Sequence, residues 1–72
     1  MKPSTLNRIA HEIPRSLHRV EKRTYDEMFA LLGQCPARTK KDAAEWIAIN
    51  VFGLNPDDES DAPKIADIRS RY

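Results

Sequence analysis

The sequence has few of the residues that cross-link or activate small proteins. Its single cysteine, Cys35, excludes a disulfide within the chain. Its two glycines, Gly33 and Gly53, stand alone and form no glycine-rich phosphate loop. The densest apolar tract, residues 43–54, is too short and too polar to cross a bilayer. One unpaired thiol together with no membrane-spanning or signal-type run indicates a cytoplasmic protein.

Metal and catalytic motifs are equally sparse. His11 and His18 stand seven residues apart with no third ligand nearby, and Cys35 is far away in the sequence. Glu12 follows His11, but Arg15 occupies the position where a His-Glu-x-x-His zinc motif needs its second histidine. We therefore expect no metal, no cofactor, no small-molecule substrate and no enzymatic activity.

An acidic segment, residues 55–62, places side-chain oxygens at alternate positions, as calcium loops do. An EF-hand loop needs glycine at its sixth position and glutamate at its twelfth, and these positions hold Ser60 and Ala66. Two prolines also interrupt the pattern. The segment is therefore predicted to be a turn that leads into the cap of a helix.

Seventy-two residues form one domain, residues 1–72, which buries about 60% of the surface that its unfolded chain exposes. The spacing of apolar residues is helical throughout, so we expect an all-α fold, a small bundle of three to four helices at about 4–13, 14–32, 39–53 and 62–70. The clearest run alternates steps of four and three residues, through Leu6, Ala10, Ile13, Leu17, Val20 and Thr24.

Capping residues set the expected helix boundaries. Ser4 is a plausible first cap, and Pro14 favours two helices that meet at a corner, because an interior proline costs about 3 kcal/mol. Gly33 is suited to the left-handed conformation that ends many helices. Thr39 with Asp42 three residues later has the pattern of a capping box, and Gly53 ends that helix.

The small net charge of +1 conceals an uneven distribution. Residues 1–41 carry nine lysines and arginines against four acids, a net charge of +5, whereas residues 42–72 carry three against seven, a net charge of −4. Such a difference indicates an anionic partner for the basic half, or two solvated surfaces of opposite sign. The charges alone leave these alternatives open.

The cations of the first half are ordered along a helix face. If the segments on both sides of Pro14 share one helical phase, the cations lie opposite the apolar stripe, at intervals suited to a row of phosphates. A second group of cations precedes and opens the third predicted helix. The predicted nucleic-acid-binding residues are Arg8, Arg15, Arg19, Lys22, Arg23, Arg38, Lys40 and Lys41.

Residues 25–54 also have the outline of a helix-turn-helix, but the six positions from Gly33 to Arg38 exceed the usual turn of three to four residues. The opening of the third helix, residues 39–44, resembles the second helix of the ribbon-helix-helix family. That family needs an alternating strand near its N-terminus, and the apolar spacing of residues 6–13 is helical. Neither motif is predicted.

Apolar residues surround the third helix, so more than one of its faces should be buried. Trp46, Ile49 and Phe52 are the residues predicted to contact a protein partner or a second copy, with burial in the core as the alternative. We therefore expect a small DNA-binding regulator of transcription that grips the phosphate backbone and forms a dimer. The alternative is a protein-interaction adaptor or inhibitor of the phage or plasmid type.

Overall fold

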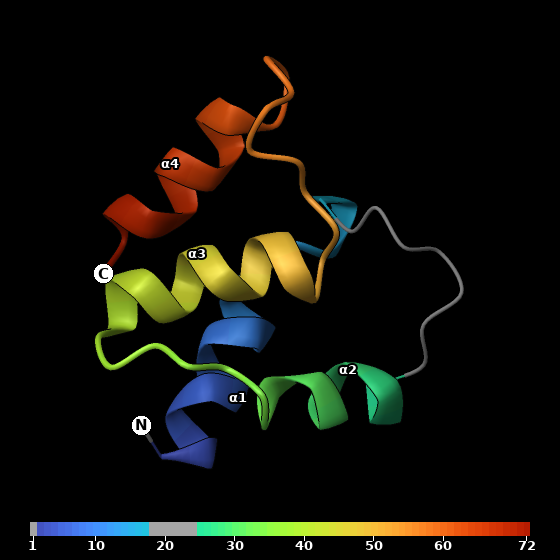
Figure 1. Ribbon diagram of the computed structural model, residues 1–72, viewed down its shortest axis with the longest axis vertical. Helices are drawn as coiled ribbons and strands as arrows, with labels where there is room; N and C mark the ends of the chain where they lie inside the picture. Colours follow the sequence, from blue (N-terminus) through green and yellow to red (C-terminus); the bar gives the residue numbers. More distant parts are fainter. Residues whose placement is uncertain (1, 18–24) are drawn as a thin grey trace.

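The computed structural model of this protein describes residues 2–17 and 25–72 (Figure 1). Its elements are α1 (Pro3–Glu12), the 3₁₀ turn η1 (Arg15–Leu17), α2 (Tyr25–Leu32), α3 (Lys40–Asn50) and α4 (Ala62–Ser70). No strand occurs in the described part of the chain, so the predicted all-α bundle is confirmed. None of the helices in these two ranges is both long enough and apolar enough to cross a membrane.

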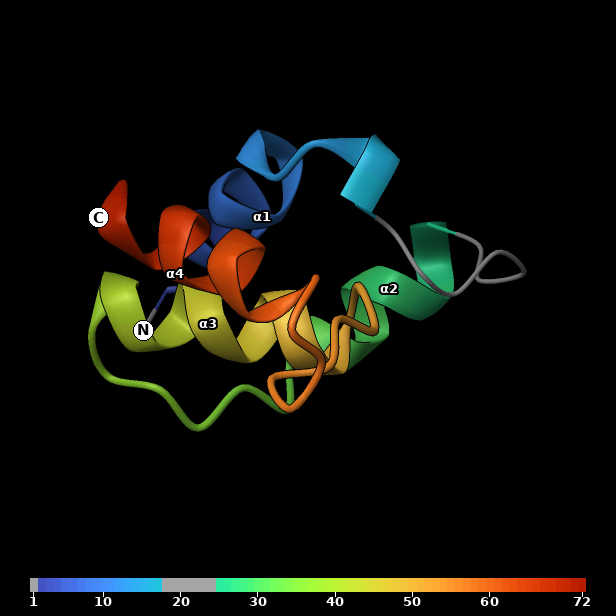
Figure 2. The same ribbon diagram turned by 90° about the horizontal axis from the view of Figure 1, so that it is seen from above.

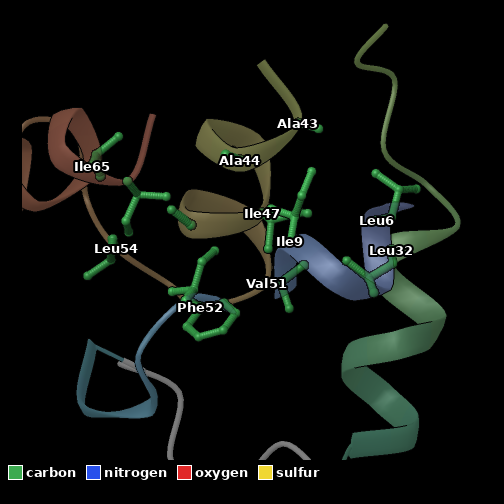
Figure 3. Close-up of a cluster of buried hydrophobic side chains, with 13 residues drawn as sticks. Leu6, Ile9, Leu32, Ala43, Ala44, Ile47, Val51, Phe52, Leu54 and Ile65 are labelled. Carbon is green, nitrogen blue, oxygen red and sulfur yellow. The ribbon is translucent and has the colours of Figure 1, made fainter. Parts of the chain in front are cut away.

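Helix α3 is the centre of the fold. It packs against α4 and α1, and α1 in turn packs against α2 (Figures 1 and 2). Figure 3 shows the resulting core, with Leu6 and Leu32 at one side and Leu54 and Ile65 at the other. The fully buried residues of α3 and its last turn are Ala43, Ala44, Ile47, Ala48 and Val51. The three small alanines among them allow α1 and α4 to approach the α3 backbone closely.

The first predicted helix, residues 4–13, is confirmed as α1, but its cap is corrected. Lys2, in extended conformation, is the N-cap, and Pro3 rather than Ser4 opens the helix. Proline suits this first position because its fixed φ is helical and its missing N–H would have no partner there. The helix stops at Glu12 because Pro14 disfavours the helical conformation for the preceding residue, and Ile13 is extended (φ −75°, ψ 126°).

The second predicted helix, residues 14–32, is present in part. Its start is the 3₁₀ turn η1 and its end is α2, while residues 18–24 lie outside the described residues. Because Ile13 is extended and η1 is a 3₁₀ turn, α1 does not carry its helical phase past Pro14. The predicted continuous basic face required one helical phase on both sides of Pro14, and the structure breaks that phase at Ile13.

The third predicted helix, residues 39–53, is confirmed as α3 with a shorter end. Thr39 is its N-cap and accepts a hydrogen bond from the Asp42 N–H at 3.2 Å, as predicted. The helix proper stops at Asn50, and Gly53 then takes a left-handed conformation with φ 79°. Gly33 follows the end of α2 without a positive φ, which corrects the left-handed role expected for it.

The acidic segment forms the turn that was predicted between α3 and α4. The Asn55 side chain accepts from the Asp57 N–H at 2.9 Å, and the Asp58 carboxylate accepts from the Ser60 N–H at 2.8 Å. Asp61, which is 3% exposed, accepts from the Asn55 N–H at 3.1 Å and so closes the loop. These bonds fold the segment back to the start of α4 at Ala62.

Candidate nucleic-acid interface

One cation of the predicted basic face, Arg8, lies on α1, and His11 is three residues further along the same helix. Arg8 and His11 are both exposed, and their spacing of three residues places them on neighbouring positions of the helix surface. The same helix buries Leu6 and Ile9. The amphipathic pattern therefore separates Arg8 from the core as the sequence predicted.

The rest of that face cannot be assembled from the described residues. Arg15 belongs to η1, but its side chain is outside the description, as are Arg19, Lys22 and Arg23 in the segment 18–24. Their proposed contacts with phosphate therefore still depend on the sequence.

The second group of cations lies where α3 begins. Arg38, Lys40 and Lys41 are all exposed. Lys40 and Lys41 occupy the first turn of α3, where backbone N–H groups have no partner within the helix and point outward along its axis. Positive side chains and outward N–H groups at one helix end are a suitable arrangement for an anion such as phosphate.

The acids that follow these lysines are held by an arginine from another helix. Arg69 of α4 lies 2.7 Å from both the Asp42 and the Glu45 carboxylates. Its guanidinium, with a contribution from the Thr39 hydroxyl, lowers the pKa of the Asp42 carboxyl below its ordinary value of 3.8. Because Arg69 pairs with both carboxylates, these carboxylates attract the ammonium groups of Lys40 and Lys41 less strongly.

The start of α3 is also joined to the end of α4 by Lys41, whose ammonium lies 3.4 Å from the Arg69 carbonyl oxygen. The bond is long and exposed, so it restrains Lys41 only weakly. Figures 1 and 2 place the starts of α1 and α3 and the end of α4 on the same side of the molecule. Lys2, the cap of α1, is a cation on that side that sequence reasoning did not select, because nothing in the sequence joins it to α3.

The predicted partner surface is changed by the structure. Phe52 is 2% exposed and belongs to the core, so it presents no surface to a partner. Phe52 follows the end of α3, and its N–H donates to the Ile47 carbonyl oxygen at 3.0 Å, so its backbone is still held against the last turn of the helix. Trp46 and Ile49 are half-buried and remain accessible.

Trp46 and Ile49 line an open groove of about 310 Å³ between α3 and the loop that precedes it. A second groove of about 230 Å³ lies between α3 and α4, where Ala66 and Pro56 are among the lining residues. Glu45 lines both grooves, so they adjoin each other. Together they form a mostly apolar surface along the outer face of α3.

The C-terminal residue takes part in a contact that the sequence did not indicate. The Tyr72 hydroxyl donates a hydrogen bond to the Glu12 carboxylate at the end of α1. Burial, reinforced by that carboxylate, raises the pKa of the Tyr72 hydroxyl to about 12. Sixty residues separate the two partners, so only the tertiary fold brings them together.

Residues 2–17 and 25–72 bring no three histidine, cysteine, aspartate or glutamate side chains into a group that could hold a metal ion. Cys35 is a half-buried free thiol in the loop before α3. The described chemistry is therefore that of surfaces: a basic helix start, a mostly apolar double groove and an acidic loop. No protein-family model, curated protein or solved structure matches this chain.

Proposed function

We propose that the protein is a small non-enzymatic DNA-binding regulator of transcription that acts in the cytoplasm. The observation that supports the proposal is the start of α3, where Lys40 and Lys41 are exposed and belong to the first helical turn, whose backbone N–H groups point outward along the helix axis. A phosphate oxygen at this point gains both the lysine charges and the positive end of the helix dipole. Arg8 on α1 adds a further exposed cation.

On the sequence alone, the proposed contacts extend to Arg15, Arg19, Lys22 and Arg23, and Arg38 precedes the α3 site. Contacts of this kind bind DNA and set its orientation but do not read bases. About five phosphate contacts give a log-log dependence of affinity on salt with a slope of roughly −4 to −5.

The test is a titration of the protein into fluorescently labelled duplex DNA at about 50 mM and 200 mM salt. We expect binding at the lower salt, and Lys40→Gln should weaken it and reduce the salt slope by about 1. Lys64→Gln is the matched control, since Lys64 lies on α4 next to Asp61. No binding at about 50 mM salt, or equal losses for both variants, would contradict the proposal.

A second candidate function is a protein-interaction adaptor or inhibitor, and the open groove at Trp46 and Ile49 favours it. In that case Ile49→Ser abolishes function, whereas Lys40→Gln does not. A defined partner in a pull-down, combined with no affinity for DNA at low salt, would decide for this candidate.

A further inference from the structure

The double groove on the outer face of α3 has ends of opposite charge. Pro36 and Ala37, on the loop that runs to the start of α3, line the first groove, and exposed Arg38 follows them directly in the chain. Pro56 lines the second groove, and exposed Asp57 follows it. One apolar surface is thus bordered by a cation at the start of α3 and by the acidic loop beyond its C-terminus.

These end charges have no partners within the described part of the chain. No hydrogen bond or ion pair engages the side chains of Arg38, Asp57 or Glu59 there. The eleven residues of α3 span about 16 Å, which exceeds the screening length of about 8 Å at physiological salt. The two ends are therefore too far apart to neutralise each other within one molecule.

The middle of the surface is different, because its charges already have a partner. Arg69 lies 2.7 Å from both Asp42 and Glu45. The open charges are therefore at the ends, and the apolar contacts, Trp46, Ile49 and Ala66, lie between them. Figure 2 shows both end segments on one side of α3, the side away from α1, and Figure 1 shows that one of them lies below α3 and the other above it.

A surface with a positive end, an apolar middle and a negative end is complementary to itself when one copy is rotated by a half turn. We propose that the occupant of the double groove is a second copy of this chain, with the two α3 helices antiparallel about a two-fold axis. Arg38 of each copy then faces Asp57 and Glu59 of the other. An interface with this symmetry is closed, so assembly stops at the dimer.

This arrangement gives the groove at Trp46 and Ile49, on which the proposed protein-interaction role rests, a defined partner. It does not depend on binding to DNA. It uses Arg38 for the dimer and leaves Lys40 for phosphate. Lys40 stands three and four residues before the buried Ala43 and Ala44, so it is at the edge of the core side of α3 and not on the groove face. An interface built on a helix of eleven residues is small, and we expect a dissociation constant in the micromolar range, on the order of 10 μM.

The decisive experiment measures molar mass by sedimentation equilibrium without DNA, for wild type and for two charge-reversed variants. Arg38→Glu makes both ends of the surface acidic, and Asp57→Arg with Glu59→Arg makes both ends basic. Each variant alone should dissociate at least tenfold more readily than wild type. An equimolar mixture of the two should form a heterodimer, because every end contact is again between opposite charges. Lys2→Glu, which reverses an exposed charge off the groove, should dimerise as wild type does.

A second pair of variants tests the apolar middle of the surface. Ala66→Glu places a charge at an exposed helical position in the second groove and should abolish the dimer while the fold is retained. Ala30→Glu makes the same change at an exposed position of α2 outside both grooves and should have no effect. Circular dichroism confirms that both variants are folded.

The fluorescence of Trp46, the single tryptophan, provides an independent reading, since it should shift to the blue as the protein concentration rises. A monomer at every concentration up to about 1 mM, far above the expected dissociation constant, would overturn the proposal. So would a dimer whose charge-reversed variants fail to form the mixed species. Neither outcome bears on DNA affinity, which Lys40→Gln tests separately.

Discussion

The two halves of this molecule are held together in different ways. Helices α3 and α4 share fully or almost fully buried residues such as Ile47 and Ile68, and Arg69 fixes their register through two carboxylates of α3. The intervening loop is closed by hydrogen bonds to Asp58 and Asp61. Apolar contact and specific polar contact therefore act on the same helix pair.

The N-terminal half depends mainly on apolar contact. Helix α1 buries Leu6 and Ile9 against the core, and among the described side chains of α2 only Leu32 is fully buried. The bond from Tyr72 to Glu12 joins the end of α1 to a residue sixty positions away in the chain. The comparison indicates that the α3–α4 pair is fixed by both apolar packing and ion pairs, whereas α2 is held to the rest of the fold by fewer buried side chains.

The strongest test of this difference compares two truncations in the core. Phe52→Ala, at the end of α3, should cost about 3–5 kcal/mol, which approaches the whole stability of a small domain. Leu32→Ala should cost nearer 2 kcal/mol, since Leu32 lies at the edge of the core where neighbours can relax. Urea unfolding followed by circular dichroism measures both. Equal losses would remove the distinction between the halves.

The two glycines provide the next test. Gly53→Ala should cost about 1–2 kcal/mol because φ is 79° there, in the left-handed region that L-residues disfavour. Gly33→Ala should be neutral or slightly stabilising, since an added Cβ would meet its nearest atom, the Ala30 carbonyl oxygen, at an ordinary 3.5 Å. Thermal unfolding of the two variants separates them, and a loss at Gly33 as large as that at Gly53 would contradict the backbone described.

The Arg69 contact predicts how the stability of the α3–α4 unit depends on pH. Folding lowers the pKa of Asp42, so the stabilisation is complete above the ordinary value of 3.8 and is lost as the pH falls through the lower folded value. Arg69→Met should therefore flatten the decline of melting temperature in acid. Arg71→Met, which breaks the exposed pair with Asp67, serves as the control. Parallel curves for wild type and Arg69→Met would count against the contact.

The smallest expected effect concerns the tie between Tyr72 and Glu12. Tyr72→Phe should cost less than about 1 kcal/mol, because the hydroxyl is only partly removed from water. Folding raises the pKa of this phenol from 10.0 to about 12, so its contribution is complete below pH 10.0 and is lost as the pH rises through about 12. A titration of phenolate absorbance should show a late step that Tyr72→Phe removes. If both tyrosines of the wild type titrate near pH 10.0, the tie is absent.

Local signals in the sequence identified most of the elements but not all of their details. The Thr39 cap, the helix at 62–70 and the turn before it follow from residues within a few positions of one another, and all three are confirmed. The role of Ser4 was wrong because Pro3 competes for the same helix start. Gly33 and Gly53 look alike in sequence, and only the path of the chain after each one separates them.

The candidate site was less accessible to sequence reasoning. Exposure of Arg8, Lys40 and Lys41 follows from helical periodicity and was predicted; Trp46 and Ile49, for which partner contact and core burial were both open, are half-buried against the core. For Phe52 the sequence left partner contact and core burial open, because α3 is apolar on every side and its pattern does not show which apolar residues face inward; the structure places Phe52 in the core. The contacts of Arg69 were not foreseen, because its partners lie 24 and 27 residues away in the sequence.

The sequence by itself determined the helical class, the Thr39 cap and the division of charge between the halves, because these depend on interactions between near neighbours and on composition. The tertiary structure decided which face of α3 is buried, which acids Arg69 takes up and which charges are left open at the two ends of the double groove. Those outcomes depend on packing between segments distant in the chain, and no local pattern specifies which of several apolar faces a neighbouring helix covers.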